Sequence, residues 1–535
     1  MPKWYHSYQY FATIKSMSTL ENQRKEFEPP LPELLKDLKV LHFKEVMNVD
    51  HDEEIKEKFV LSSHDALLRA QVGETGKTKP IKVGVVFSGG QASGGHNVIT
   101  GLFDGLKKLH KDSELIGFLN GPSGIIEARS RKLDAEGLQD FRNMGGFDLI
   151  GSGRTKIETE EQFASSLASI KKLELNGLVI IGGDDSNTNA ALLDEYLRKN
   201  EYDCKVVGVP KTIDGDLQNE WVQISFGFDS ACRVYSEMIG NIARDCLSAK
   251  KYTHFVKLMG RSASHIALEC ALATQPNKTL IGEEIAREEK TLSQITYDLV
   301  DLIEKRSKGG KDYGVILIPE GLIEFIPEVR NLIAELNKLI GSGQEHPETK
   351  LSEEAKKTFN FMPEKIQQQL LLERDSHGNV QVSKIDTQDL LMETVQIEIK
   401  KHRDFKGKFS PVSHFFGYEG RAGYPTNFDA TYCYALGHVA ALLIEEGHSG
   451  FMAALNGLTK PVSEWEPTGV PLTSLMHFEM RKGKRKPVIA KALVDLSGKP
   501  FRSFAEKRGT WAQNDEYLFP GPTQYNEEAV PPLIC

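Results

Sequence analysis

The sequence lacks the closely spaced cysteine pairs from which zinc sites and redox-active disulfides are usually built. Its six cysteines lie far apart, and CxxC spacing occurs nowhere in the chain. Because such sites need two thiols close together, both kinds of site are disfavoured. We therefore expect reduced cysteines, as is typical of a cytosolic protein.

Long hydrophobic runs are also missing. No apolar run reaches the roughly 18 residues that cross a bilayer, and the start MPKWYHSYQYFATIKS lacks the continuous apolar core of a secretory signal,. We therefore expect a cytoplasmic location and no membrane partner. The first acidic residue is Glu21, which leaves an organelle transit peptide open, and an extended leader ahead of Met17 fits equally well,.

The chain has no excess of positive charge. It carries 66 Lys and Arg residues against 75 Asp and Glu residues, which gives a net charge of −9. General nucleic-acid binding rewards a basic surface, so we expect no nucleic-acid partner. A local basic pocket for a small phosphorylated ligand stays open. With 535 residues, 40% of them hydrophobic, the chain is long enough for two or more globular domains,.

From Ile81 onward, short β-branched apolar runs alternate with amphipathic segments. We expect strands at 81–90, 114–121, 147–153, 175–183, 204–210, 253–260 and 312–321,. This alternation predicts an α/β fold with parallel sheets covered by helices on both faces. In such sheets ligands bind beyond the carboxyl ends of the strands.

The rest of the chain has a different character. Residues 1–80 are mixed and charged and predict an extension that packs on the main body, whereas 322–405 hold amphipathic stretches that predict a helical insertion,. An apolar helix is expected from Tyr432 to about Glu446. The stretch after Lys484 mixes basic residues with prolines and is expected to wrap the surface.

Two glycine-rich loops follow expected strands. SGGQASGGHN at 88–97 has the form of a phosphate cradle, although a structural tight turn would explain it about as well,. GGDDSN at 182–187 lets Asp184 approach a hard cation such as Mg²⁺,. The alternative is that Asp185 or Ser186 caps the helix that follows.

A third loop, PKTIDGDL at 210–217, brings a lysine and two carboxylates together. Asp214 or Asp216 could accept a proton beside a metal-bound phosphate, and Lys211 could offset charge on a transferred phosphoryl group. An Asp-rich turn with an exposed lysine is the alternative. Further strand ends carry residues suited to a phosphorylated polyol, namely Arg154, Met259, Gly260, Arg261, Glu320, Tyr418, Glu419 and Arg421,.

The motifs SGG (88–90), GGDD (182–185), PKTIDGD (210–216), MGR (259–261), PEG (319–321) and GYEGR (417–421) occur in this order. In this arrangement the sequence resembles the phosphofructokinase superfamily, and its long pyrophosphate-dependent form most closely. The resemblance implies two three-layer, Rossmann-like α/β domains. It divides the chain into an extension (1–80), a phosphoryl-donor domain (81–240), the first part of a sugar-phosphate domain (241–321), the insertion (322–405), a second sugar-phosphate part that returns to the donor domain (406–480) and a tail (481–535).

The resemblance also assigns roles to residues of this sequence. Gly90, Arg154, Asp185 and Lys211 match donor-site positions, Asp184 and Asp216 the acidic residues at Mg²⁺, and Asp214 the general base. The fructose 6-phosphate site is implied at Thr212, Ile213, Asp214, Met259, Gly260, Arg261, Glu320, Tyr418, Glu419, Gly420 and Arg421. Lys251 and Tyr252 match positions that reach the neighbouring subunit's sugar phosphate, so the resemblance implies a homodimer or a higher homo-oligomer.

The choice of donor rests on two of these positions. ATP-dependent relatives typically have glycine at the position of Asp185 and a small residue at that of Lys211. A carboxylate there would repel the α-phosphate region of a nucleotide, whereas the lysine would favour a compact diphosphate. We therefore expect reversible, Mg²⁺-dependent phosphoryl transfer between pyrophosphate and the 1-hydroxyl of fructose 6-phosphate. The alternatives are an ATP-dependent phosphofructokinase and a noncatalytic regulatory subunit.

Overall fold

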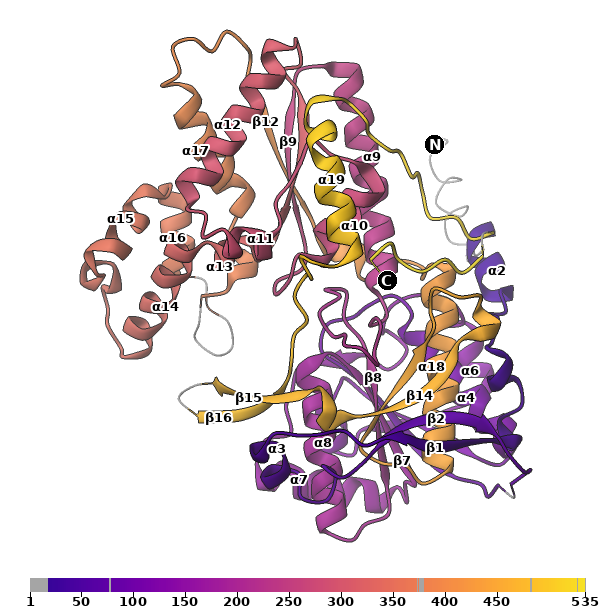
Figure 1. The fold of residues 1–535 in the computed structure, drawn as a ribbon. Helices are drawn as coiled ribbons and strands as arrows, with labels where there is room; N and C mark the ends of the chain where they lie inside the picture. The colour runs from indigo at the N-terminus through magenta and orange to yellow at the C-terminus, as the bar shows by residue number, and fades with distance from the viewer. Residues whose placement is uncertain are drawn as a thin grey trace, which may run out of the picture.

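The chain folds into a larger and a smaller lobe, each built on a β-sheet (Figure 1). The computed structural model describes residues 18–76, 78–372, 374, 380–481, 484–526 and 528–534. The leader expected ahead of Met17 lies outside these residues. Among the residues described, the cysteines are buried with free thiols, and no helix is long and apolar enough to cross a membrane.

The sheet of the larger lobe has the strand order β1-β2-β14-β13-β8-β7-β3-β4-β5, and β6 pairs with β3. The strands are β1 (Leu41–Met47), β2 (Leu67–Val72), β3 (Lys82–Ser88), β4 (Glu114–Phe118), β5 (Ser130–Leu133), β6 (Ser152–Gly153), β7 (Gly177–Gly182), β8 (Lys205–Pro210), β13 (Phe451–Asn456) and β14 (Glu466–Pro471). The centre of the sheet is parallel, as expected, but β1, β2, β14 and β5 pair antiparallel at its margins. The prediction of a strand at 147–153 is wrong for most of its length, because a turn occupies 148–150 and only the two residues of β6 form a strand.

Helices cover both faces of this sheet. On β3, Val85 and Phe87 belong to the same apolar core as α4 (Gly95–Leu109) and α18 (Asn427–Glu445), whereas Val86 belongs to that of α7 (Glu160–Lys172) and α8 (Asp184–Lys199). Side chains alternate across a strand, so a doubly covered sheet is apolar throughout. Helices α4 and α18 lie very close: a Cβ on Gly101 would stand 2.1 Å from the Tyr434 carbonyl oxygen.

The smaller sheet is entirely parallel, with the order β10-β11-β9-β12. Its strands are β9 (Thr253–Leu258), β10 (Lys278–Thr279), β11 (Gly314–Pro319) and β12 (Pro411–Phe416). Helices α9 (Phe228–Ala249), α10 (His265–Thr274) and α19 (Lys499–Gln513) pack on one face, and α12 (Leu292–Lys308) and α17 (Thr387–Ile399) pack on the other. The expectation of two three-layer α/β domains is confirmed.

The helical insertion is confirmed over its described residues, with α13 (Leu322–Phe325), α14 (Pro327–Gly341), α15 (Glu353–Phe361) and α16 (Glu364–Leu372) before α17. The N-terminal extension packs on the body as expected, since β1 and β2 join the larger sheet. The tail does more than wrap the surface: its hairpin β15 (Met476–Arg481) and β16 (Lys484–Ile489) lies on the larger lobe, and the chain then crosses to α19 (Figure 1). The remaining helices are α2 (Thr19–Glu26), α3 (Glu53–Lys58), α5 (Ser123–Ile126), α6 (Ala135–Gln139) and α11 (Gly282–Arg287).

Candidate active site

The three loops singled out from the sequence begin side by side at one edge of the larger sheet. Strand β7 lies between β3 and β8, and the parallel register aligns Ser88 with Gly182 and Gly182 with Pro210. The loops that follow β3, β7 and β8 therefore leave the sheet together. This is the carboxyl edge, where parallel α/β sheets bind their ligands.

A buried lysine lies beneath the first two loops. Lys211 is only 6% exposed, and burial, followed by the charge of Arg421, lowers its pKa to about 8. A Cβ on Gly89 would stand 3.4 Å from the Lys211 Nζ, and a Cβ on Gly183 would stand 4.0 Å from it. Within the described residues Lys211 forms no ion pair, so this buried ammonium suits an anionic ligand.

Two arginines complete the cationic part of the site around Gly90. A Cβ there would stand 2.4 Å from Arg421 Nη1 and 3.6 Å from Arg154 Nη2. Arg421 comes from the loop after β12 in the smaller lobe, and it donates to the Gln91 carbonyl (3.2 Å) and to Met259 Sδ (3.1 Å). The structure thus places Arg421 where the two lobes meet, rather than among the sugar-loop residues alone.

Carboxylates lie near Lys211, since the charges of Asp214 and Asp184 act on its ammonium. Asp214 and Asp216 are both buried, with Gly215 between them at φ +74, a conformation that favours glycine,. The pKa of Asp216 is raised to about 7 by burial and then by the neighbouring charge of Asp214, with a smaller contribution from Asp184. A buried carboxylate beside other carboxylates is stabilised by a nearby cation.

The residues fit a partly solvated metal ion better than a complete protein cage. Within the described part of the chain, no group of three or more His, Cys, Asp or Glu side chains is arranged to hold a metal. Asp184 and Asp216 would supply hard oxygen ligands, and Mg²⁺ in proteins usually takes one or two carboxylates together with phosphate oxygens and water. The donor set therefore fits Mg²⁺ bound together with a phosphate ligand.

The start of α8 decides between the two interpretations of the Asp-Asp pair. The N-cap residue is Gly183, which has no side chain, and Asp185 and Ser186 lie inside the first turn. Asp185 instead forms an ion pair with Lys156 (3.1 Å), a residue that no sequence motif singles out, while Ser186 Oγ donates to Ser88 Oγ (2.8 Å). The interpretation of Asp185 or Ser186 as the N-cap residue is therefore wrong.

The sugar-site residues lie at the carboxyl ends of β9, β11 and β12. Glu320 is buried, accepts a hydrogen bond from the Gly260 N–H (2.8 Å), and has its pKa raised by burial. Gly260 has φ +130, and a Cβ on Gly321 would collide with the Arg261 carbonyl oxygen at 1.9 Å. The two loops after β9 and β11 thus pack backbone against backbone. From the loop after β12, Tyr418 is 75% exposed.

Lys251 and Tyr252 are not brought to this site. They precede β9, whereas Met259 follows it, so the length of the strand separates them by about 20 Å,. Lys251 Nζ instead lies 4.8 Å from the centre of the Tyr252 ring. Any role for this pair at a sugar site requires a second copy of the chain.

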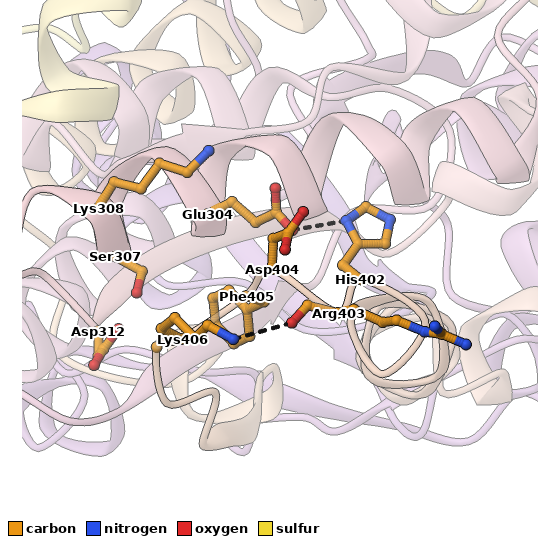
Figure 2. A pocket seen from close by; sticks show the side chains of 10 residues that line it. Glu304, Ser307, Lys308, Asp312, His402, Arg403, Asp404, Phe405 and Lys406 are labelled. Atoms are coloured by element: carbon orange, nitrogen blue, oxygen red, sulfur yellow. Dashed lines mark hydrogen bonds and ion pairs between the residues drawn. The ribbon is translucent and has the colours of Figure 1, made fainter.

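A separate hollow of about 500 Å³ lies between the last turn of α12 and the loop 402–407 (Figure 2). On its wall, His402 Nδ1 lies 2.7 Å from Glu304 Oε1, and Lys406 donates to the Arg403 carbonyl (3.3 Å). This hollow precedes β11 and β12, whereas the candidate site follows them. It therefore lies at the opposite edge of the smaller sheet.

The fold and the site together define an α/β protein with a site suited to a phosphorylated ligand where its two lobes meet. The phosphofructokinase family model matches residues 82–444, and the chain belongs to this family. It is 53% identical over 471 residues to the pyrophosphate–fructose 6-phosphate 1-phosphotransferase of Treponema pallidum, covering 85% of this chain and 82% of that protein. It is 48% identical to the Entamoeba histolytica protein of the same name, and the match covers 95% of this chain and 96% of that protein.

A solved structure shows the same fold at much lower identity. The pyrophosphate-dependent phosphofructokinase of Nitrosospira multiformis superimposes with a TM-score of 0.54 at 15% identity, covering 83% of this chain and 95% of that one.

Proposed function

We propose that this protein is a phosphotransferase that moves a phosphoryl group reversibly between pyrophosphate and the 1-hydroxyl of fructose 6-phosphate. The products are fructose 1,6-bisphosphate and phosphate, a step of glycolysis and of gluconeogenesis. The observation that carries this proposal is the buried ammonium of Lys211 beneath Gly89, close enough to Asp214 and Asp184 to feel their charges. The names of the relatives agree with it.

The donor would lie over Gly90, with Lys211 and Arg154 offsetting the charge that develops on the transferred group. Asp184 and Asp216 would hold Mg²⁺, whose charge stabilises the donor phosphates. Asp214 is the proposed general base that removes the proton of the sugar 1-hydroxyl. Its backbone N–H donates to Thr212 Oγ1 (3.1 Å), which fixes the start of this turn.

The rim of the site supports pyrophosphate as the donor. The ion pair between Lys156 and Asp185 lies at the start of α8, where the remainder of a nucleotide would extend. Opening this pair and accommodating an α-phosphate beside Asp185 costs free energy that the smaller diphosphate avoids. An ATP-dependent enzyme is the less favoured alternative.

The sugar phosphate would be bound by loops from both lobes. The residues proposed to bind it are Thr212, Ile213, Asp214, Met259, Gly260, Arg261, Glu320, Tyr418, Glu419, Gly420 and Arg421. We propose that Lys251 and Tyr252 complete the sugar site of a neighbouring subunit, so the active form is at least a homodimer. We also propose a cytoplasmic location. The proposed domains of the chain end at residues 80, 240, 321, 405 and 480, as expected from the sequence.

The proposed reaction is tested by replacing Asp214 with Ser. Removing the base should abolish formation of fructose 1,6-bisphosphate from pyrophosphate and fructose 6-phosphate, while calorimetric binding of fructose 6-phosphate persists. Turnover that survives would contradict the assignment of the base. A wild-type protein that binds the sugar phosphate without turning it over would favour the regulatory-subunit alternative.

A further inference from the structure

The tail of the chain contributes a lysine that none of the sequence motifs contains. Residues 490–498, here called the interlobe strap, run from β16 on the larger lobe to α19 on the smaller lobe (Figure 1). Lys491 lies in this strap. Its ammonium is 3.7 Å from Asp184 Oδ2 and 3.8 Å from Asp216 Oδ2, and it donates to Ser262 Oγ at 2.6 Å.

The strap is held by backbone hydrogen bonds to both lobes. On the larger lobe, the Ala490 N–H donates to the Leu475 carbonyl (2.9 Å), and the Ala492 N–H donates to the Asp216 carbonyl (2.8 Å). On the smaller lobe, the Ala492 carbonyl accepts from His265 Nε2 (3.0 Å). The position of Lys491 is therefore fixed by the main chain and not only by its own flexible side chain.

Within the part of the chain that the structure describes, Lys491 is the one side chain that forms an ion pair with either proposed metal ligand. Asp184 and Asp216 lie beside Asp214, so their negative charges repel one another. A cation near both carboxylates reduces that repulsion and keeps them close together. Lys491 supplies this charge from outside the loops that follow β3, β7 and β8.

The hydrogen bond of Lys491 to Ser262 is stronger than its ion pairs with Asp184 and Asp216. At 2.6 Å the ammonium makes a direct hydrogen bond to Ser262, whereas at 3.7 and 3.8 Å it is attracted to the carboxylates without hydrogen-bonding to them,. Mg²⁺ binds carboxylate oxygens directly, at about 2.0 to 2.1 Å. A metal ion can therefore displace the weaker attraction while Lys491 stays bound to Ser262.

We propose that Lys491 is a positioning residue that acts as the counter-cation of Asp184 and Asp216 and competes with the metal ion for them. This rests on the metal site of the proposed function. Ser262 directly follows Arg261 of the sugar loop, so the same ammonium links the metal carboxylates of one lobe to the sugar-binding loop of the other.

The experiment is a titration of the full-length protein with Mn²⁺ alone, without pyrophosphate or sugar phosphate, followed by electron paramagnetic resonance of the free ion. The variants are Lys491→Met and Lys491→Gln, which remove the charge, and Lys491→Arg, which keeps it. Lys499→Met, on the first residue of α19, is the matched control. Asp184→Asn identifies the site that is being measured.

We expect Lys491→Met and Lys491→Gln to bind Mn²⁺ about fivefold to tenfold more tightly than the wild type, because a partly exposed competing charge has been removed,. Lys491→Arg and Lys499→Met should bind as the wild type does. A purely structural role predicts the opposite sign, since loosening the site weakens binding. In the absence of metal, both neutral variants should also have a lower unfolding temperature.

Unchanged or weaker Mn²⁺ binding in the two neutral variants would overturn the proposal. If Asp184→Asn leaves Mn²⁺ binding intact, the metal site itself is misassigned and the proposal falls with it. These two failures are distinguishable, because the first leaves an Asp184-dependent Mn²⁺ site in the wild type and the second does not.

Discussion

Replacing Lys211 with Met should remove activity and at the same time stabilise the fold. A buried ammonium binds a diphosphate well, but it costs free energy when no anion is present. Burial lowers the pKa of Lys211 from its ordinary 10.5 to about 8. By linkage this corresponds to a destabilisation of about 3 kcal/mol at pH 7.

The direction of this stability change follows from the lowered pKa of Lys211. Because the folded-state pKa lies below the unfolded value, the charged form is penalised in the folded protein. The penalty is complete below pH 8 and disappears as the pH rises from about 8 to 10.5, falling to less than about 1 kcal/mol at pH 10. Lys211→Met should therefore raise the ligand-free unfolding temperature at pH 7 and have much less effect at pH 10.

The activity should change in the opposite direction. Loss of one buried, charged contact to the transferred group is expected to lower kcat/KM for pyrophosphate by about 10² to 10³, with binding of fructose 6-phosphate unchanged. Lys211→Arg should restore only part of the lost activity, because the longer, planar guanidinium cannot place its charge where the buried ammonium lies,. A Met variant that loses both activity and stability would refute this reasoning and make Lys211 a structural cation.

Three further substitutions test other parts of the site. Gly90→Ala would place a methyl group 2.4 Å from Arg421 Nη1 and should raise the KM for pyrophosphate at least about tenfold,; an unchanged KM would mean that the donor lies elsewhere. Asp185→Gly also removes the partner of Lys156 and should raise kcat/KM for ATP relative to pyrophosphate, whereas an unaltered ratio would assign donor choice to another loop. Lys251→Ala should abolish activity alone, and mixing it with Asp214→Ser subunits should restore part of it; if no mixture recovers activity, the shared site is wrong.

The sequence predicts the part of the site that depends on local pattern. Strands β3, β7 and β8 are apolar runs in which Gly or Pro stands at or directly after the last residue, so their limits and the loops after them can be inferred from the sequence pattern,. Parallel pairing then brings these loops to one edge. The resemblance supplies the roles, because Asp214 and Asp216 alone do not distinguish a base from a metal ligand.

Other features depend on contacts between distant segments. Lys491 lies in an unremarkable basic stretch, and only the path of the strap between the lobes brings it to Asp184 and Asp216. Lys156 pairs with Asp185 because the loop after β6 folds back on α8. The strand expected at 147–153 failed because its apolar residues Phe147 and Ile150 are buried in a turn that packs on neighbouring helices and strands, so burial and not strand pairing explains the pattern.

The most direct test of the central claim is the initial rate of fructose 1,6-bisphosphate formation by the wild-type protein with Mg²⁺ and fructose 6-phosphate. Pyrophosphate and ATP are supplied in separate reactions as the sole phosphoryl donor. The buried Lys211 and the Lys156–Asp185 pair predict rapid turnover with pyrophosphate and little with ATP. Turnover with ATP and none with pyrophosphate would contradict the account of the donor site.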